Sequence, residues 1–270
     1  MATESTLYFV ANLILFALLL LYWAFLFRPD WIPDRMLLGT LLLFLGCQGI
    51  ALLWSGLRLG PWAFALPYLR AMFLMETVVL VYLLLEWLLK QRGAGAFILT
   101  LAFIIHAYVI LAIPPPVERS LQISPFVRSP WHLLHLLSAL IAYGAYTCAG
   151  GGTIGYFVAR FLTRTRFAPR FPSTQDCEMF TRRALVIGFP WLSGSLLTGA
   201  LWAQLAWGSY WSWRLEEVWL LIVWLILTMT LHVRTVRGWQ GRPLALLSLL
   251  GFTLALLSLP LLGRGLAPGS

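Results

Sequence analysis

Charged residues are scarce in this chain of 270 residues: they make up 11% of it, whereas hydrophobic residues make up 60%. A soluble domain usually carries about 25% charged residues. Water cannot solvate a surface so poor in charge, so we expect the outer surface of the protein to face lipid. The length suits one compact bundle, and residues 1–270 are therefore expected to form a single transmembrane domain.

Cysteine is also rare, and the three residues present are Cys47, Cys148 and Cys177. No two of them form a C-x-x-C pair, which argues against a disulfide framework and against a thiol-relay membrane protein. The C-x-x-C-H motif that attaches c-type haem is absent as well, so the chain is not itself a c-type cytochrome.

Acidic residues are outnumbered, because 19 Lys and Arg stand against 10 Asp and Glu, for a net charge of +9. The basic residues lie between apolar runs rather than on one exposed stripe, which favours membrane topology over nucleic-acid binding. Most of them fall in the inner connections if the N-terminus is placed outside. We therefore expect an N-out, C-out protein, in a bacterial inner membrane.

Eight apolar runs approach or exceed the length that spans a hydrocarbon core about 30 Å thick. The first lacks a basic n-region and a cleavage site, which indicates a retained helix. Backbone polar groups must be paired in lipid, so each run should be helical. The expected fold class is all-α, a polytopic membrane helix bundle of about eight transmembrane helices. Their ranges are roughly 7–27, 37–56, 66–89, 95–113, 131–159, 184–204, 217–234 and 243–262.

Two features stand out in these ranges. The run 131–159 is longer than a bilayer needs and should tilt or protrude. Its triple glycine at 150–152 predicts close helix packing. The segment 160–183 is polar and basic, and we expect it to form a cytoplasmic loop near anionic headgroups.

Tryptophan is abundant in one place: six of the 14 tryptophans fall within 202–224, which reads WAQLAWGSYWSWRLEEVWLLIVW. An aromatic belt at headgroup level accounts for one or two indoles at a helix end. Trp207, Trp211 and Trp213 crowd a single short connection, which suits a platform for a large, planar, apolar ligand. Composition alone leaves both the belt and the platform open.

The run W-G-S-Y-W-S-W at 207–213 closely resembles the cytochrome c assembly family, the haem-handling superfamily that includes the CcsA/ResC, CcmC, CcmF and HemX-like proteins. The signature of that family is a Trp-rich outer segment, W-G-x-x-W-x-W-D, followed by a helix that ends in Leu-His. Further matches are Glu217, Trp219, Trp224, Leu231-His232 and, upstream, Trp131-His132-Leu133-Leu134-His135. The resemblance implies a protein of cytochrome c biogenesis that binds haem b and presents it at the outer face. As an enzyme it would be at most part of a haem–cytochrome c ligation system.

The chain has four histidines, and neutral imidazole is a common axial ligand of haem iron. By the resemblance, His135 corresponds to an external haem ligand of the family and His232 to a transmembrane one, so both are candidate metal ligands. His132 precedes His135 by one turn and is a candidate to replace it or to hydrogen-bond a haem propionate. His106 has no counterpart in the family, and we expect it to be a packed core residue.

The chain departs from the family pattern at two places. Arg214 stands where the family has Asp after W-x-W, which reverses a charge but suits an anionic propionate. The C-terminal sequence GRGLAPGS contains no histidine, whereas the CcsA type carries a second external one. External haem is then left with His135 as its protein ligand. The candidate cofactor-binding residues are His135, His232, His132, Trp207, Trp211, Trp213 and Arg214.

The expected partners are membrane lipid, a ResB/CcsB-like membrane protein and an apocytochrome c, with no nucleic acid. The alternative is a HemX-like accessory or structural subunit with a degenerate haem site, in which the Trp-rich segment packs against another protein. A solute transporter has little support, because no inverted repeat or broken-helix pair is evident.

Glu76 lies deep in the third run and is expected to pair with an arginine such as Arg70; a polar path or a quinone contact is the other possibility.

Overall fold

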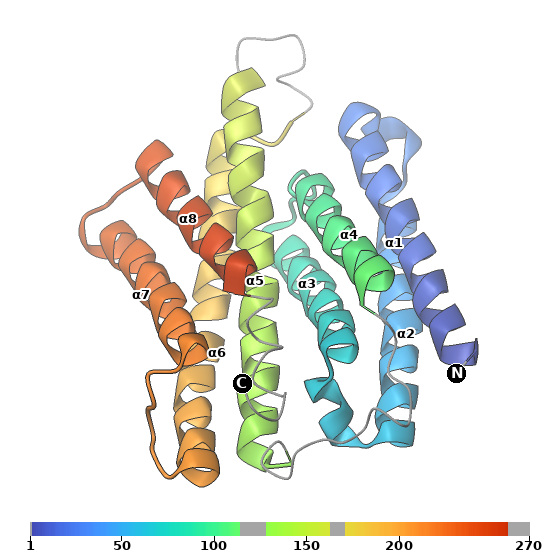
Figure 1. Ribbon diagram of the computed structural model, residues 1–270. Helices are drawn as coiled ribbons and strands as arrows, with labels where there is room; N and C mark the ends of the chain where they lie inside the picture. The colour runs from blue at the N-terminus through green and yellow to red at the C-terminus, as the bar shows by residue number, and fades with distance from the viewer. Residues whose placement is uncertain (1, 114–127, 163–170, 259–270) are drawn as a thin grey trace.

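The computed structural model describes residues 2–113, 128–162 and 171–258, and side chains from residue 6 onward. Within those ranges the chain is all-helical, and its helices lie roughly alongside one another in a bundle (Figure 1). Short 3-10 turns precede α2 and α3. The elements are α1 (Ala2–Phe27), η1 (Pro29–Trp31), α2 (Asp34–Leu59), η2 (Pro61–Ala65), α3 (Pro67–Leu89), α4 (Gly95–Ala112), α5 (Pro130–Leu162), α6 (Thr174–Trp207), α7 (Leu215–Val236) and α8 (Arg242–Ser258).

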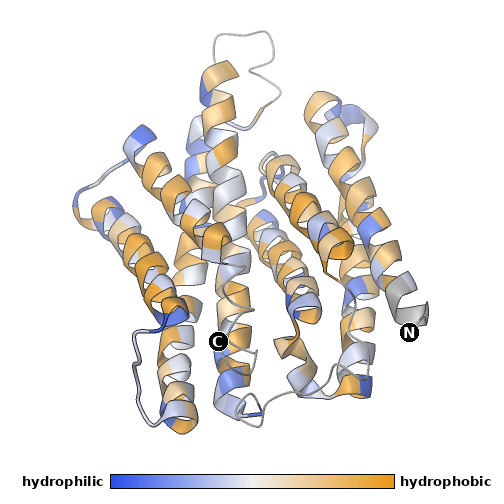
Figure 2. Cartoon of the chain, in the orientation of Figure 1, coloured by the Kyte–Doolittle hydropathy of each residue, from blue (hydrophilic) through white to orange (hydrophobic). Residues whose placement is uncertain are grey.

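The helices of the described ranges have the length and composition of membrane spans. Seven of them, α1 to α7, are long and apolar enough to cross a bilayer, and α8 is apolar with 17 residues. Figure 2 shows hydrophobic residues along the helices and hydrophilic ones mainly toward their ends. Large apolar side chains point outward, as at Leu57 (76% exposed) and Leu111 (86% exposed), which suits contact with lipid. The predicted polytopic all-α membrane fold is confirmed.

Helix α5 is the best-buried span of the bundle and packs against α3, α4, α6 and α8. Its 33 residues extend about 50 Å, more than a hydrocarbon core requires, as predicted. A Cβ atom added to Gly150 would lie 2.5 Å from the Phe252 ring, and one added to Gly151 would lie 2.4 Å from Ile98 Cγ1. Only glycine leaves room for these neighbours, so the expected close packing at 150–152 is confirmed.

Helix α6 begins well before the predicted residue 184. Ser173 Oγ accepts a hydrogen bond from the Asp176 backbone N–H (3.1 Å), and Asp176 Oδ2 accepts one from the Ser173 N–H (3.3 Å). This capping box starts the helix in polar sequence, where a search for apolar runs finds nothing. The prediction of a loop over 160–183 is therefore wrong for 174–183, and also for 160–162, which end α5. Residues 163–170 lie outside the described residues.

The remaining boundaries agree with prediction to within about five residues. The predicted end of the last helix at 262 and most of the connection 114–130 lie outside the described residues. Orientation in the membrane stays a prediction, and we use it for names only. The outer end of the bundle is the one that carries 208–214, at the bottom of Figure 1, and the inner end carries 90–94.

Candidate functional site

His135 lies near the outer start of α5 and is held by α6. Its Nδ1 atom is 2.8 Å from the backbone carbonyl oxygen of Ser195 and 3.0 Å from Ser195 Oγ. Because a carbonyl oxygen can only accept, Nδ1 carries the proton, and Ser195 Oγ is left to donate to the His135 carbonyl (3.1 Å). Nε2 of the neutral ring is then unprotonated, which is the form in which imidazole binds a metal.

Gly199 leaves the space that this ring occupies. It lies one helical turn after Ser195, and a Cβ atom added to it would be 2.7 Å from His135 Nδ1. The sequence analysis missed both residues. Their signal is the spacing of two small residues four positions apart, which places them on one helix face.

Aromatic rings surround the two outer histidines. The Trp202 ring centroid is 4.6 Å from that of the buried His132 and 6.3 Å from that of His135, to which it is nearly parallel at 18°. Trp207 meets Trp202 edge to face at 5.5 Å. These distances are typical of favourable aromatic packing. We call His132, His135, Trp202 and Trp207 the His–Trp cluster.

Two arginines from different parts of the chain border this cluster. The Arg214 guanidinium carbon lies 4.6 Å from the centre of the Trp207 ring, and its Nε is 3.8 Å from Glu216 Oε2. Arg70, at the outer start of α3, is 8% exposed and donates to the backbone carbonyl of Ala65. Both arginines line the same cavity as the two histidines, so cationic groups stand beside a candidate metal ligand.

Two small cavities share Trp202 as part of their walls. One, of about 100 Å³, is bordered by His132, Arg70 and Arg214, and the other, of about 80 Å³, by Ser195 and Trp211. Both include His135, Trp202, Glu216 and Glu217 in their walls. Cofactor pockets usually enclose about 300–1,000 Å³, so a large planar ligand would have to separate the walls of these cavities.

The connection 208–214 forms one wall of this region. It starts at Gly208, whose φ of 74° ends α6, and it reaches α7 through Trp213, whose φ of 56° is unusual for a residue other than glycine. Glu217 Oε2 accepts from the backbone N–H groups of Ser212 (2.8 Å) and Arg214 (3.4 Å), which fixes the return into α7.

The predicted tryptophans of this connection divide into two kinds. Trp207 and Trp211 line the cavities, whereas Trp213 is 74% exposed and meets Trp211 edge to face at 5.9 Å. Tyr210 lines the second cavity and is 59% exposed. The connection therefore offers one set of rings to the cavities and another to the outside.

The other two histidines lie apart from the cluster. His232 is exposed near the inner end of α7 and borders neither outer cavity, so the structure does not bring it together with His135. His106 is fully buried, with Nδ1 3.2 Å from Asn12 Oδ1 and Nε2 3.1 Å from Met72 Sδ, which confirms a packed core residue. The described residues contain no group of three or more His, Cys, Asp or Glu arranged for a metal ion.

Glu76 does not pair with Arg70 as expected. Its Oε2 atom is buried and has no hydrogen-bond partner among the described residues, and a Cβ atom on Gly49 of α2 would lie 3.4 Å from its Oε1. The Arg70 side chain instead contributes to the cavity beside the His–Trp cluster. The prediction misplaced that arginine because a sequence shows neighbours along a helix but not which way a long side chain extends.

The chain is similar in sequence to a protein family and to several named proteins. The sequence profile of the family described as "Cytochrome C assembly protein" matches residues 65–263. A protein named cytochrome c biogenesis protein CcsA from Picosynechococcus sp. is 27% identical, with 98% of this chain and 97% of the relative covered. The protein of that name from Microcystis aeruginosa is 29% identical (94% and 93% covered), and the one from Marchantia polymorpha is 29% identical (74% and 76%). The matched region contains the whole His–Trp cluster.

Proposed function

The chain belongs to the cytochrome C assembly protein family, and on that premise we propose that it acts in cytochrome c biogenesis by binding haem b at the outer end of the bundle and passing it to an apocytochrome c. The observation that carries the proposal is the state of His135. Its Nδ1–H is committed to the Ser195 carbonyl, so Nε2 is the basic nitrogen, beside a cavity with two arginines. Metal-ligating histidines are typically oriented by a hydrogen bond of this kind.

The residues of the site fit a haem in three respects. His135 would hold the iron through its Nε2 atom. Arg70 and Arg214 supply positive charge for its two propionates, and guanidinium groups bind carboxylates well. Trp202 and Trp207 would supply ring faces for a planar apolar body, and Trp211 lines the adjoining cavity.

The chain's own contribution is to bind and orient. Haem, when bound, brings the vinyl groups that form thioether bonds with cysteines of the apocytochrome. Because the cavities beside His135 are small, binding would require their walls to separate, and the connection 208–214 contributes to one of those walls. His132 lies 6.5 Å from His135 between ring centroids, near enough to hydrogen-bond a propionate or to take over as ligand. His232 is proposed as a separate ligand site nearer the inner end.

The membrane and partners belong to the same proposal. We place the protein in a bacterial inner membrane with its N-terminus and C-terminus outside, beside a ResB/CcsB-like membrane partner. Trp213 and Tyr210 expose their rings at the outer end, where a partner or an apocytochrome would arrive. That same exposure favours the second candidate function, a HemX-like accessory subunit in which the Trp-rich segment contacts a protein rather than haem.

An absorption spectrum distinguishes the two functions. The wild-type protein, His135→Ala and His232→Ala are each expressed in cells supplied with haem and purified in mild detergent. We expect a Soret band in the wild type that weakens or shifts in His135→Ala, with His106→Gln as a control because His106 is a packed core residue. A colourless wild type that co-purifies with a membrane partner would instead support the accessory function.

A further inference from the structure

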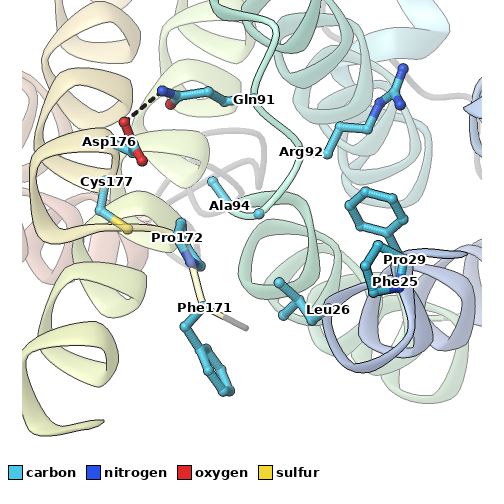
Figure 3. Close-up of a pocket in the computed structure, with 11 residues that line it drawn as sticks. Phe25, Leu26, Pro29, Gln91, Arg92, Ala94, Phe171, Pro172, Asp176 and Cys177 are labelled. Carbon is cyan, nitrogen blue, oxygen red and sulfur yellow. Dashed lines mark hydrogen bonds between the residues drawn. The ribbon is translucent and has the colours of Figure 1, made fainter. Parts of the chain in front are cut away.

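Two cavities among the described residues of the inner end are larger than the two beside the His–Trp cluster. One, of about 300 Å³, lies between the end of α1, residues 91–94 and the start of α6 (Figure 3). A second, of about 470 Å³, lies between α1, α2 and α3. Both reach the size range of ligand pockets, and Phe25 and Arg92 border both.

The polar side chains of the first inner cavity are already engaged with protein. Gln91 Nε2 donates to Asp176 Oδ1 at 2.7 Å, as Figure 3 shows, and this bond joins the α3–α4 connection to α6. A Cβ atom on Gly93 would lie 2.8 Å from Pro172 Cβ, so the two segments are also in close contact. What remains is largely apolar lining, which specifies no particular ligand.

The second inner cavity is lined by two acidic and two basic side chains. Arg92 Nε is 2.8 Å from Glu86 Oε1, and Arg92 Nη1 contacts Asp34 Oδ1, so one guanidinium serves two carboxylates. Tyr22 adds a hydrogen bond to Glu86 Oε2 at 2.6 Å. Partial burial lowers the pKa of Arg92, but Glu86 and Asp34 raise it by a larger amount. The pKa of Arg92 therefore lies above its ordinary value. Lys90 is the fourth charged residue of the lining, and no ion pair of its side chain is found among the described residues. With two acidic and two basic side chains, the lining carries no net charge.

The position of these groups matches the boundary between headgroups and acyl chains. Lys90 ends α3 in the left-handed conformation (φ 53°), and Asp34 is the first residue of α2. Below them the walls are apolar, with Leu38, Leu83 and a Trp87 that is 73% exposed. Exposed tryptophan beside basic residues at helix ends is typical of a membrane interface.

We propose that this cavity binds a phospholipid with an ethanolamine headgroup, whose phosphate contacts Lys90 and whose ammonium contacts Asp34. One acyl chain then follows Leu38, Leu83 and Trp87 into the bilayer. The argument is charge balance, because a zwitterionic headgroup keeps a neutral cavity neutral. A glycerol headgroup would add an uncompensated negative charge in a partly dehydrated site, which is unfavourable. Strongly basic pockets bind anionic lipid, and this one is not basic overall.

Native mass spectrometry of the detergent-purified protein tests this inference independently of haem. The protein is titrated with phosphatidylethanolamine or with phosphatidylglycerol of the same chain length, and the bound adducts are counted. We expect the ethanolamine lipid to bind preferentially. Lys90→Gln should lower binding of both lipids by about fivefold, the contribution of one basic residue near a headgroup layer. Asp34→Asn should remove the preference while leaving glycerol-lipid binding intact or increased.

Arg35→Gln is the matched control, because Arg35 is an exposed neighbour of Asp34 that does not border the cavity. It should bind both lipids as the wild type does. A wild type that prefers the glycerol lipid overturns the proposal, because simple attraction to the basic inner end then explains binding. Equal binding by the wild type and Lys90→Gln overturns it as well. Thermal unfolding of each variant shows that it is folded before the lipids are compared.

Discussion

At the outer end of the bundle, Nε2 of His135 has no hydrogen-bond partner among the described residues and His135 borders a cavity, whereas at the inner end Arg92 engages both Glu86 and Asp34. The outer end gathers aromatic rings around polar groups, and its cavities are small. The inner end gathers opposite charges that satisfy one another, and its cavities are larger. Both ends lie on helices of one bundle, so the contrast comes from side chains rather than from the fold.

The contrast separates the proposed haem-binding role of the outer end from the part that the inner ion pairs play in holding helices together. Groups at membrane depth that keep an unused ligand atom are costly in a folded protein and are retained where a function needs them. Groups that pair with one another join helices instead: Tyr22, Glu86, Arg92 and Asp34 connect α1, α2 and α3 at the inner end. Substitutions at the two ends should therefore fail in different assays.

Glu86→Gln should have the largest effect of these substitutions, and the effect should be a loss of stability. Glu86 is 6% exposed and accepts from both Tyr22 and Arg92, so its loss leaves a partly buried guanidinium with less compensation. We expect a loss of about 3 kcal/mol in stability, measured as a lower midpoint of thermal unfolding in detergent. Below that midpoint the variant should bind haem as the wild type does. Weaker haem binding by the folded variant would contradict the claim that the inner ion pairs affect stability and not haem binding.

Gly199→Ala should have the second-largest effect, a loss of haem affinity. The added Cβ atom would lie 2.7 Å from His135 Nδ1, so the ring must leave the Ser195 carbonyl. We expect haem affinity to fall about 10–100-fold, the usual cost of losing the orienting partner of a ligand. Gly194→Ala is the matched control on the same helix, because nothing lies within 4 Å of its added Cβ atom. Equal titration curves for the two variants would contradict the role given to His135.

Ser195→Ala should have a smaller effect than Gly199→Ala. It removes the Oγ contact at 3.0 Å but keeps the backbone carbonyl that accepts from Nδ1 at 2.8 Å. One neutral hydrogen bond contributes about 0.5–1.5 kcal/mol, so haem affinity should fall roughly threefold to tenfold. Titration beside Gly199→Ala checks the order. A loss in Ser195→Ala as large as in Gly199→Ala would show that the hydroxyl, not the carbonyl, sets the tautomer.

Arg214→Gln should have the smallest effect. Its side chain is 33% exposed and already interacts with Glu216 and Trp207, so its contact with a propionate is partly screened. We expect haem affinity to fall by about twofold to fivefold, and the difference from the wild type to shrink as salt is raised. An affinity that rises in Arg214→Gln would place the propionates elsewhere.

The sequence predicted the helices well because long apolar runs in lipid have one structural solution. It missed the start of α6, since a capping box at Ser173 extends that helix through polar residues. It placed Trp207, Trp211 and His135 near one another on the family resemblance, and they do line adjoining cavities. It could not show that Arg70 joins them from α3, or that Trp202 and Ser195 face His135, because those contacts depend on how distant helices pack.

The separation of His135 from His232 was predicted from the sequence, which made His135 an external ligand and His232 a transmembrane one, and the structure keeps the two apart. Both match family histidines. His135 lies at the outer end, in the His–Trp cluster, and His232 is exposed near the inner end. The two histidines are separated because His135 is near the outer start of α5 and His232 is near the inner end of α7. A single haem bridged by both histidines is therefore incompatible with the arrangement of α5 and α7, which leaves two sites to be tested separately.

The most direct test of the central claim is a haem titration of His135→Gly, followed by absorption, with and without free imidazole. Removing the ring should abolish the wild-type Soret position, and imidazole should restore it by occupying the space beside Ser195 and Trp202. Restoration would show that the ring of His135 itself ligates the iron. A His135→Gly protein that keeps the wild-type spectrum without imidazole would contradict the account.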